Sequence, residues 1–262
     1  MTKQIDPQTE FLLSLTPVDF EARDNYLTCS NFPAILGRGY KKTKRSDTRK
    51  EYLEELLGIK KKPTPYSAMT DFGKKYEKTA LKMFEKQTGI KTYPLGTIVH
   101  DQVHPNGYYF IAGTPDAITE DGYVVEVKCL YYDPVKGILR KTYYDEVPPY
   151  YKDQAMGYVW LLKLKGYYFV QYFHDHDIKK RKISVVKVEW TDDWKNENES
   201  KIISFWDELA KRRLADLEEK ISFFVQKSEG WVQPADFASH QQRHRGPPLN
   251  DLQIKEILEE KE

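Results

Sequence analysis

The chain has 262 residues, of which 40% are hydrophobic and 14% aromatic, and its 41 basic and 40 acidic residues leave a formal net charge of +1. This length and composition exclude a disordered chain and allow one large domain, or two small ones, with a buried core. The near-neutral balance does not by itself indicate a polyanion partner, although basic clusters such as residues 41–45 and 179–182 would suit one locally.

Neither the cysteines nor the first residues indicate an extracellular protein. Cys29 and Cys129 lie far apart with no paired spacing, so no zinc site or disulfide framework is predicted and both are expected to be reduced, inert thiols. Residues 1–17 contain too short an apolar run for a signal peptide, and the chain has no apolar run that would span a membrane. We therefore expect an intracellular protein without a membrane partner.

Periodicity and capping residues predict four helical segments in the first third of the chain. These are a short helix within residues 1–28, a helix start at 30–37 with Ser30 or Asn31 as its cap, a helix over 47–57 ended by Gly58, and a strongly amphipathic helix over 69–88 ended by Gly89.

Strands dominate the middle of the chain. The pattern predicts strands at 97–100, at 108–113 with a continuation to 119, at 123–130 after a turn at 120–122, at 167–174 and at 183–190, with helices at 150–164 and 200–226. This order predicts a mixed α/β sheet flanked by helices. We expect residues 1–226 to form the main domain and residues 227–262, which are polar and interrupted by proline, to form a partly mobile extension.

Three charged residues interrupt the two strands of the predicted hairpin. Because side chains alternate along a strand, Glu126 and Lys128 share one face, and the hairpin can bring Asp116 beside Glu126. Two neighbouring carboxylates repel each other unless a cation lies between them, and an oxygen-rich, incomplete shell suits Mg²⁺, for which Mn²⁺ is the expected substitute. Lys128 could then orient a water molecule or stabilise charge developing on phosphorus.

Two further polar residues lie on apolar helix faces. Glu77 shares a face with Ala80 and Phe84, and Gln154 shares one with aromatic residues of the next helix. Glu77 could complete the metal site. The alternatives are that Glu77 is an ordinary surface acid and that Asp116, Glu126 and Lys128 form only a buried salt bridge.

The sequence resembles the PD-(D/E)xK nucleases and, within them, the phage lambda exonuclease family, the YqaJ-type viral recombinases. Besides the P-D and E-V-K residues of the core motif, the matching blocks are R-x4-T-x-S at 23–30, F-G-K-K-Y-E at 72–77, Y-x-x-Q at 151–154 and Y-Y-F-V-Q-Y-F at 167–173, in the order of the family. Phe72 stands where the family usually has Trp, and Thr114 where Ser is common. The basic insert at 41–66 and the last 35 residues have no counterpart that we can place.

The resemblance implies a restriction-endonuclease-like fold and a Mg²⁺-dependent 5′→3′ exonuclease. Its expected substrate is linear double-stranded DNA with 5′-phosphorylated ends. Such an enzyme releases 5′-mononucleotides and leaves a 3′ single strand for recombination or repair with an annealing protein. The family also implies a ring of three subunits and a viral or prophage source, which places the protein in the cytoplasm of a bacterium or host cell, or in the nucleus for a eukaryotic virus.

The resemblance also implies a role for each matched residue. Asp116 would bridge two ions, Glu126 and the Val127 carbonyl would hold one of them, and Glu77 would support the shell. Lys128 and Gln154 would orient the attacking water. The residues expected to bind the 5′-phosphate or the DNA beside it are Arg23, Thr28, Ser30 and Tyr151.

Three other interpretations remain open from the sequence. The first is a different nuclease of the same fold: a structure- or site-specific endonuclease would cut closed circular DNA, and a relative with an iron–sulfur cluster would need more than two cysteines. The second is a non-catalytic protein that binds DNA ends. The third is a transition-metal site at His174 and His176, which a polar strand end explains equally well.

Overall fold

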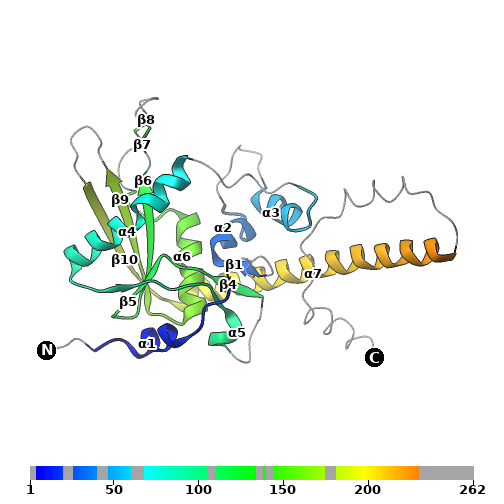
Figure 1. The fold of residues 1–262 in the computed structure, drawn as a ribbon, viewed down its shortest axis with the longest axis horizontal. Helices are drawn as coiled ribbons and strands as arrows, with labels where there is room; N and C mark the ends of the chain where they lie inside the picture. The colour runs from blue at the N-terminus through cyan, green and yellow to red at the C-terminus, as the bar shows by residue number, and fades with distance from the viewer. Residues whose placement is uncertain are drawn as a thin grey trace. The chain divides into compact units, whose positions relative to one another are not determined.

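The computed structural model describes residues 4–19, 26–39, 47–60, 68–104, 110–130, 132–133, 138–139, 144–174 and 181–229 (Figure 1). The chain divides into two compact units, the first formed by Met1–Pro33 and Thr64–Lys195 and the second by Ala34–Pro63 and Asn196–Glu262. Residues 230–262, which contain nearly all of the predicted mobile extension, lie outside the described part of the chain.

A five-stranded mixed sheet forms the centre of the first unit. In spatial order its strands are β10 (Arg181–Glu189), β9 (Gly166–His174), β6 (Val124–Leu130), β5 (Ala117–Thr119) and β2 (Thr92–Tyr93). β6 and β9 are parallel and the other pairs are antiparallel. The predicted mixed α/β sheet flanked by helices is therefore confirmed, as is the turn at 120–122, where Gly122 has a φ of +91°.

A second, three-stranded sheet lies in the same unit and corrects two strand predictions. It contains β1 (Leu27–Thr28), β4 (Ile111–Gly113) and β3 (Ile98–Val99). The predicted continuation from 113 to 119 is wrong, because the chain leaves β4 and enters β5 in the other sheet, with Pro115, which lacks a backbone donor, at the break. The predicted strand at 97–100 is shorter, since helix α5 (His100–Val103) begins where β3 ends. The remaining strands, β7 (Tyr132–Asp133) and β8 (Ile138–Leu139), pair with each other.

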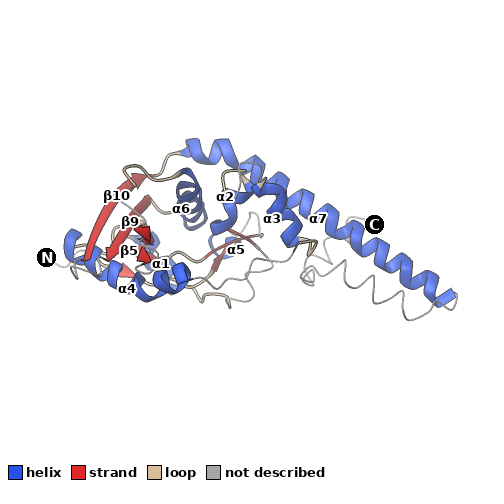
Figure 2. Cartoon of the chain, turned by 90° about the horizontal axis from the view of Figure 1, so that it is seen from above, coloured by secondary structure: helices blue, strands red, loops and turns tan. Residues whose placement is uncertain are grey.

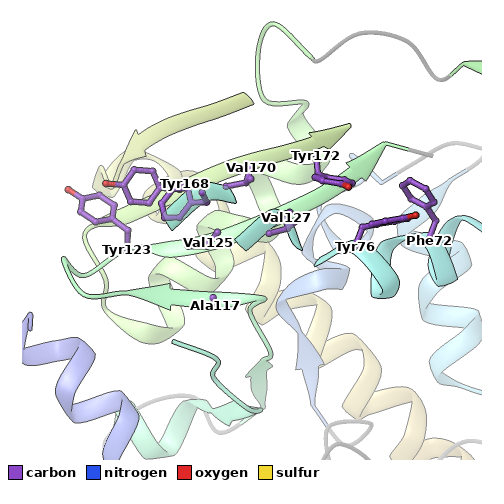
Figure 3. Packing of buried hydrophobic residues seen from close by; sticks show 11 residues of the cluster. Phe72, Tyr76, Ala117, Tyr123, Val125, Val127, Tyr168, Val170 and Tyr172 are labelled. Carbon is purple, nitrogen blue, oxygen red and sulfur yellow. The ribbon is translucent and has the colours of Figure 1, made fainter. Parts of the chain in front are cut away.

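Helix α4 (Ala68–Thr88) covers one face of the central sheet and matches its predicted range closely. Its buried residues repeat every four positions and pack on the strands. Tyr76 stacks on Tyr172 with ring centroids 5.4 Å apart (Figure 3), and the ring centroids of Phe84 and Tyr168 are 5.1 Å apart. Gly89, with a φ of +69°, follows the end of the helix. Helix α6 (Pro149–Leu162) contacts β6, β9 and β4, and α4 and α6 lie on opposite sides of the central strands (Figure 2).

Short helical segments lead into the sheets. Helix α1 (Pro7–Ser14) is capped by the Asp6 carboxylate, which accepts hydrogen bonds from the Gln8 and Thr9 amides. The helix predicted to be capped by Ser30 or Asn31 begins differently. A 3₁₀ turn, η2 (Cys29–Asn31), follows β1 and continues into α2 (Phe32–Ile35), and no side chain caps η2.

The second unit is helical within its described residues. It contains α3 (Thr48–Leu56), capped by Asp47, and the part of α7 (Asp192–Glu229) that begins at Asn196. Tyr52 of α3 stacks on Phe205 of α7 with ring centroids 5.8 Å apart, and Arg49 binds Glu208 at 2.7 Å. α7 is longer at both ends than the predicted helix 200–226. Among the described helices, none combines the length and apolar character needed to cross a membrane.

Gly157 allows η2 to pack closely on α6. A Cβ atom at this position would lie 2.6 Å from the Phe32 ring and 3.2 Å from Cys29 Cβ, and Phe32 is itself packed against Trp160 and Trp194. Overpacking at this position should cost about 1–3 kcal/mol. This cost exceeds the gain in helix propensity of up to about 1 kcal/mol, so we expect Gly157→Ala to lower the free energy of unfolding.

The matched control is Gly73→Ala in α4, where a Cβ atom would meet nothing within 4 Å. Only the gain in helix propensity remains there, so this variant should be slightly stabilised. Thermal unfolding measured on both variants checks the pair. Equal stability of the two would contradict the packing assigned to Gly157.

Candidate functional site

Strand β6 presents two charged side chains on one face and two valines on the other. Val125 and Val127 belong to the same buried core cluster as the apolar residues of α4, and Figure 3 shows both valines within that cluster. The alternation of a strand directs Glu126 and Lys128 to the opposite face, where they lie beside Phe169 and Gln171 of the parallel strand β9. The face predicted for the charged pair is therefore confirmed.

Asp116 reaches β6 from the segment that joins the two sheets. Its Oδ2 accepts a hydrogen bond of 2.7 Å from the Val127 amide. β5 begins only at Ala117, so the Asp116 carboxylate occupies the place beside β6 that a continuing strand would take. Asp116 and the β6 charges therefore lie at one end of the β5–β6 pair, as the hairpin predicted.

Glu126 is almost completely buried, with 1% of its side chain exposed, and its Oε1 forms an ion pair with Lys128 Nζ. Its Oε2 has no hydrogen-bond partner among the described residues. Burial raises the pKa of Glu126 to about 7, Lys128 opposes this shift, and Asp116 adds to it. Burial alone would lower the pKa of Lys128, but Glu126 and Asp116 outweigh it and keep the ammonium charged.

Glu77 lies beside the apolar stripe of α4 and is half-buried, rather than being at the centre of the stripe. Burial and the neighbouring Asp116 raise its pKa, while Lys128 lowers it, so Glu77 lies within the electrostatic influence of the site. Among the described residues, however, no three acidic, histidine or cysteine side chains are close enough together to hold one ion. The structure thus brings together Asp116 and Glu126, and the participation of Glu77 stays a prediction.

Helix α6 contributes two of the predicted residues. The Tyr151 ring faces Lys128, with Nζ 4.8 Å from the ring centroid. Gln154 Nε2 donates to the Tyr158 hydroxyl at 3.3 Å, and burial followed by the charge of Glu126 raises the pKa of Tyr158. Gln154 therefore binds a tyrosine that lies within the electrostatic influence of Glu126. The role of Gln154 in orienting the attacking water stays a prediction.

The segment predicted to bind phosphate carries a cluster of small polar side chains. Thr28 Oγ1 lies 3.1 Å from Ser30 Oγ and accepts a 2.8 Å hydrogen bond from Asn31 Nδ2. Ser30 is exposed and Thr28 is partly exposed, so both hydroxyls are accessible. Arg23 lies outside the described residues, as do His176 and the side chain of His174, so a histidine metal site stays a hypothesis.

Both cysteines are free thiols near the site. Burial raises the pKa of Cys29 well above its usual value, and burial, Asp116 and Glu77 together raise the pKa of Cys129 to about 12. Both shifts disfavour the reactive thiolate form, which agrees with the predicted inert role.

Gln171 has no role among the residues predicted from the sequence, although its position carries a signal. A glutamine inside an apolar strand is as anomalous as Gln154 on an apolar helix face, and the structure places it directly beside Lys128. Tyr144, which precedes α6, and Tyr150, which lies in its first turn, were also missed.

The residues present fit a divalent cation. Glu126 has a buried carboxylate oxygen without a hydrogen bond, Asp116 lies beside the same strand, and both offer the hard oxygen donors that Mg²⁺ prefers. A cation would also reduce the repulsion that Asp116 exerts on Glu126.

A mixed sheet that presents an acidic residue and an E-x-K pair at one end of its strands defines the PD-(D/E)xK class of folds. More specifically, the YqaJ-like viral recombinase domain matches residues 20–164, which is more than half of the chain, and the chain belongs to this family. No curated protein matches the chain significantly.

Several solved structures resemble this chain. The alkaline exonuclease LHK-Exo from Laribacter hongkongensis is 19% identical with a TM-score of 0.53, and its complex with dAMP is 18% identical with a TM-score of 0.52. Each alignment covers 80% of this chain and 96% of the other. A phage-related exonuclease from Haemophilus somnus is 15% identical with a TM-score of 0.48, over 71% and 96% of the two chains. At these identities, the two LHK-Exo structures support the fold.

Proposed function

We propose that this chain is a Mg²⁺-dependent 5′→3′ exodeoxyribonuclease that degrades one strand of linear double-stranded DNA to 5′-mononucleotides. Its family of viral recombinases and the likeness to LHK-Exo, which has also been solved with dAMP, support a nuclease. The observation that carries the proposal is Glu126, a buried carboxylate with one oxygen unpaired, flanked by Asp116 and Lys128.

Each residue of the site has a task in this reaction. Asp116 and Glu126 would hold the cation, with the Val127 carbonyl and Glu77 completing the shell. When bound, the cation supplies Lewis-acid stabilisation of the charge on the phosphate oxygens. Lys128 places a fixed positive charge at the same point, and Gln154 helps to orient the attacking water. Tyr151 restricts Lys128 from one side by its cation–π contact.

A linear duplex with a labelled 5′-phosphate at one end tests this proposal, with closed circular duplex as the matched control. We expect the label to be released as a mononucleotide only when Mg²⁺ or Mn²⁺ is present. The circular duplex should stay intact. Cleavage of the circle would instead identify an endonuclease. If the protein binds DNA but cleaves neither substrate with Mg²⁺ or with Mn²⁺, it is a non-catalytic protein that binds DNA ends.

Arg23→Ala should remove the preference for 5′-phosphorylated over 5′-hydroxyl ends. A guanidinium matches the oxygens of a phosphate, and the hydroxyls of Thr28 and Ser30 are accessible in the same segment. Initial rates on the two kinds of end, measured for the parent chain and the variant, check this expectation. Equal rates on both ends in the parent chain would contradict the phosphate-anchor assignment.

The partners expected from the family belong to the same proposal. They are an annealing protein that takes up the 3′ single strand and two further copies of this chain in a ring around the duplex. Sedimentation of the purified chain would test the ring, with a trimer as the expected species.

A further inference from the structure

Gln171 is a completely buried glutamine whose side chain binds the backbone of one distant residue. Its Oε1 accepts a 2.7 Å hydrogen bond from the Tyr144 amide, and its Nε2 donates a 3.0 Å hydrogen bond to the Tyr144 carbonyl. Gln171 thus satisfies both backbone groups of a residue 27 positions earlier in the chain, in the way a neighbouring strand would.

The position of Gln171 in the sheet relates this clamp to the candidate active site. Lys128 and Gln171 are paired in register on the parallel strands β6 and β9, so their side chains lie next to each other on the same face. A buried amide must have its polar atoms hydrogen-bonded, as both are here, whereas an aliphatic side chain would fill the same strand position without that requirement. The amide adds a fixed attachment point for Tyr144 on the face that carries the site.

Tyr144 connects the clamp to Lys128 through aromatic contacts. Its hydroxyl lies 3.3 Å from the Tyr150 hydroxyl, and its ring meets the Tyr151 ring edge-on with centroids 6.1 Å apart. Tyr151 in turn packs on Phe169 and faces Lys128 Nζ. The contacts therefore run without a gap from Gln171, through Tyr144 and Tyr151, to the ammonium group beside Glu126.

We propose that Gln171 is a positioning residue for Lys128, acting through Tyr144 and Tyr151. This inference rests on the proposed nuclease function, in which Lys128 acts on the scissile phosphate. Gln171 itself touches neither the substrate nor the cation. By fixing Tyr144 it fixes the tyrosine that confines the Lys128 side chain, so its loss changes turnover and leaves the binding of DNA and Mg²⁺ intact.

Gln171→Met tests the proposal, because Met has a similar shape and makes neither hydrogen bond. We expect kcat on linear duplex to fall about 10-fold, the lower end of the usual loss for a supporting residue around a metal site, with KM and Mg²⁺ affinity unchanged. Hydrogen exchange at the Tyr144 amide should accelerate. The matched control is Tyr167→Phe, which removes a buried hydroxyl from the same strand and should keep full kcat.

A double-mutant cycle keeps the test decisive if Gln171→Met folds poorly. Tyr144→Ala removes the half-buried ring that transmits the effect, so it should lower kcat to the same extent, and the double variant should lose no more than either single one. Full kcat in Tyr144→Ala, or additive losses, would overturn the inference. If the parent chain cleaves DNA and Gln171→Met has the same kcat as Tyr167→Phe, the positioning role of Gln171 is wrong and the proposed nuclease function stands. If the parent chain does not cleave DNA, the proposed function is wrong as well.

Discussion

Replacing Lys128 with alanine is expected to reduce the single-turnover rate of cleavage by about 10²–10³-fold, the usual loss for one group that stabilises developing charge. The ammonium lies next to Glu126, and the carboxylates around it raise its pKa, so it stays charged across the physiological range. Affinity for duplex DNA should change little, because Lys128 is largely buried and can supply at most one of the phosphate contacts on which that affinity depends. Fluorescence anisotropy in metal-free buffer measures this affinity.

Lys128→Ala also leaves Glu126 buried without its partner, so its thermal stability should fall. The rates must therefore be compared at a temperature where both proteins are folded. Lys187→Ala is the matched control, since Lys187 also forms an ion pair and a cation–π contact on the central sheet, with Glu189 and Tyr123 respectively. Cleavage by Lys128→Ala at the rate of this control would remove Lys128 from the chemistry.

Glu126→Gln should abolish detectable Mg²⁺-dependent cleavage and yet stabilise the metal-free protein. Burial raises the pKa of Glu126 to about 7 in the folded state, above its unfolded value. The ionised carboxylate therefore destabilises the fold, and metal-free stability is lost as the pH rises from about 4.5 to about 7. At pH 8 the uncharged glutamine should raise the free energy of unfolding by about 1–3 kcal/mol, which is several degrees in Tm.

Magnesium should remove most or all of the stability advantage of Glu126→Gln over the parent chain. A ligand that binds only the folded state at 100 times its Kd adds about 2.7 kcal/mol, so the parent chain should gain stability that Glu126→Gln does not. Thermal unfolding at pH 5 and pH 8, with and without Mg²⁺, measures both effects. The control is Glu120→Gln, a buried carboxylate in the neighbouring turn, which should keep the response to Mg²⁺. A Glu126→Gln variant that is still stabilised by Mg²⁺ would contradict the assignment of Glu126 as a metal ligand.

Local sequence patterns predicted the parts of the site that lie on single strands and helices. The alternation of β6 placed Glu126 and Lys128 on one face, and the apolar repeat of α4 placed its buried stripe against the sheet. Asp116 was also predicted, because the turn at 120–122 returns the chain antiparallel to itself.

Contacts between distant segments could not be predicted in the same way. The break at Pro115 moves the chain from one sheet to another, and periodicity along one strand carries no signal for such a change. The clamp between Gln171 and Tyr144 joins residues 27 positions apart, and only the parallel pairing of β6 with β9 places it beside Lys128. Glu77 lies beside the apolar stripe of α4 rather than within it, because the residues that face the sheet are spaced four apart and include Tyr76 and Ala80.

The central claim is that Asp116 and Glu126 together hold a divalent cation that DNA cleavage requires. Anomalous diffraction from crystals soaked in Mn²⁺ tests it most directly, because manganese is located by its own scattering. We predict a peak within coordination distance of the Asp116 and Glu126 carboxylate oxygens. The account would be contradicted if the protein cleaves DNA and manganese binds elsewhere, with no ion at the Asp116 and Glu126 carboxylates.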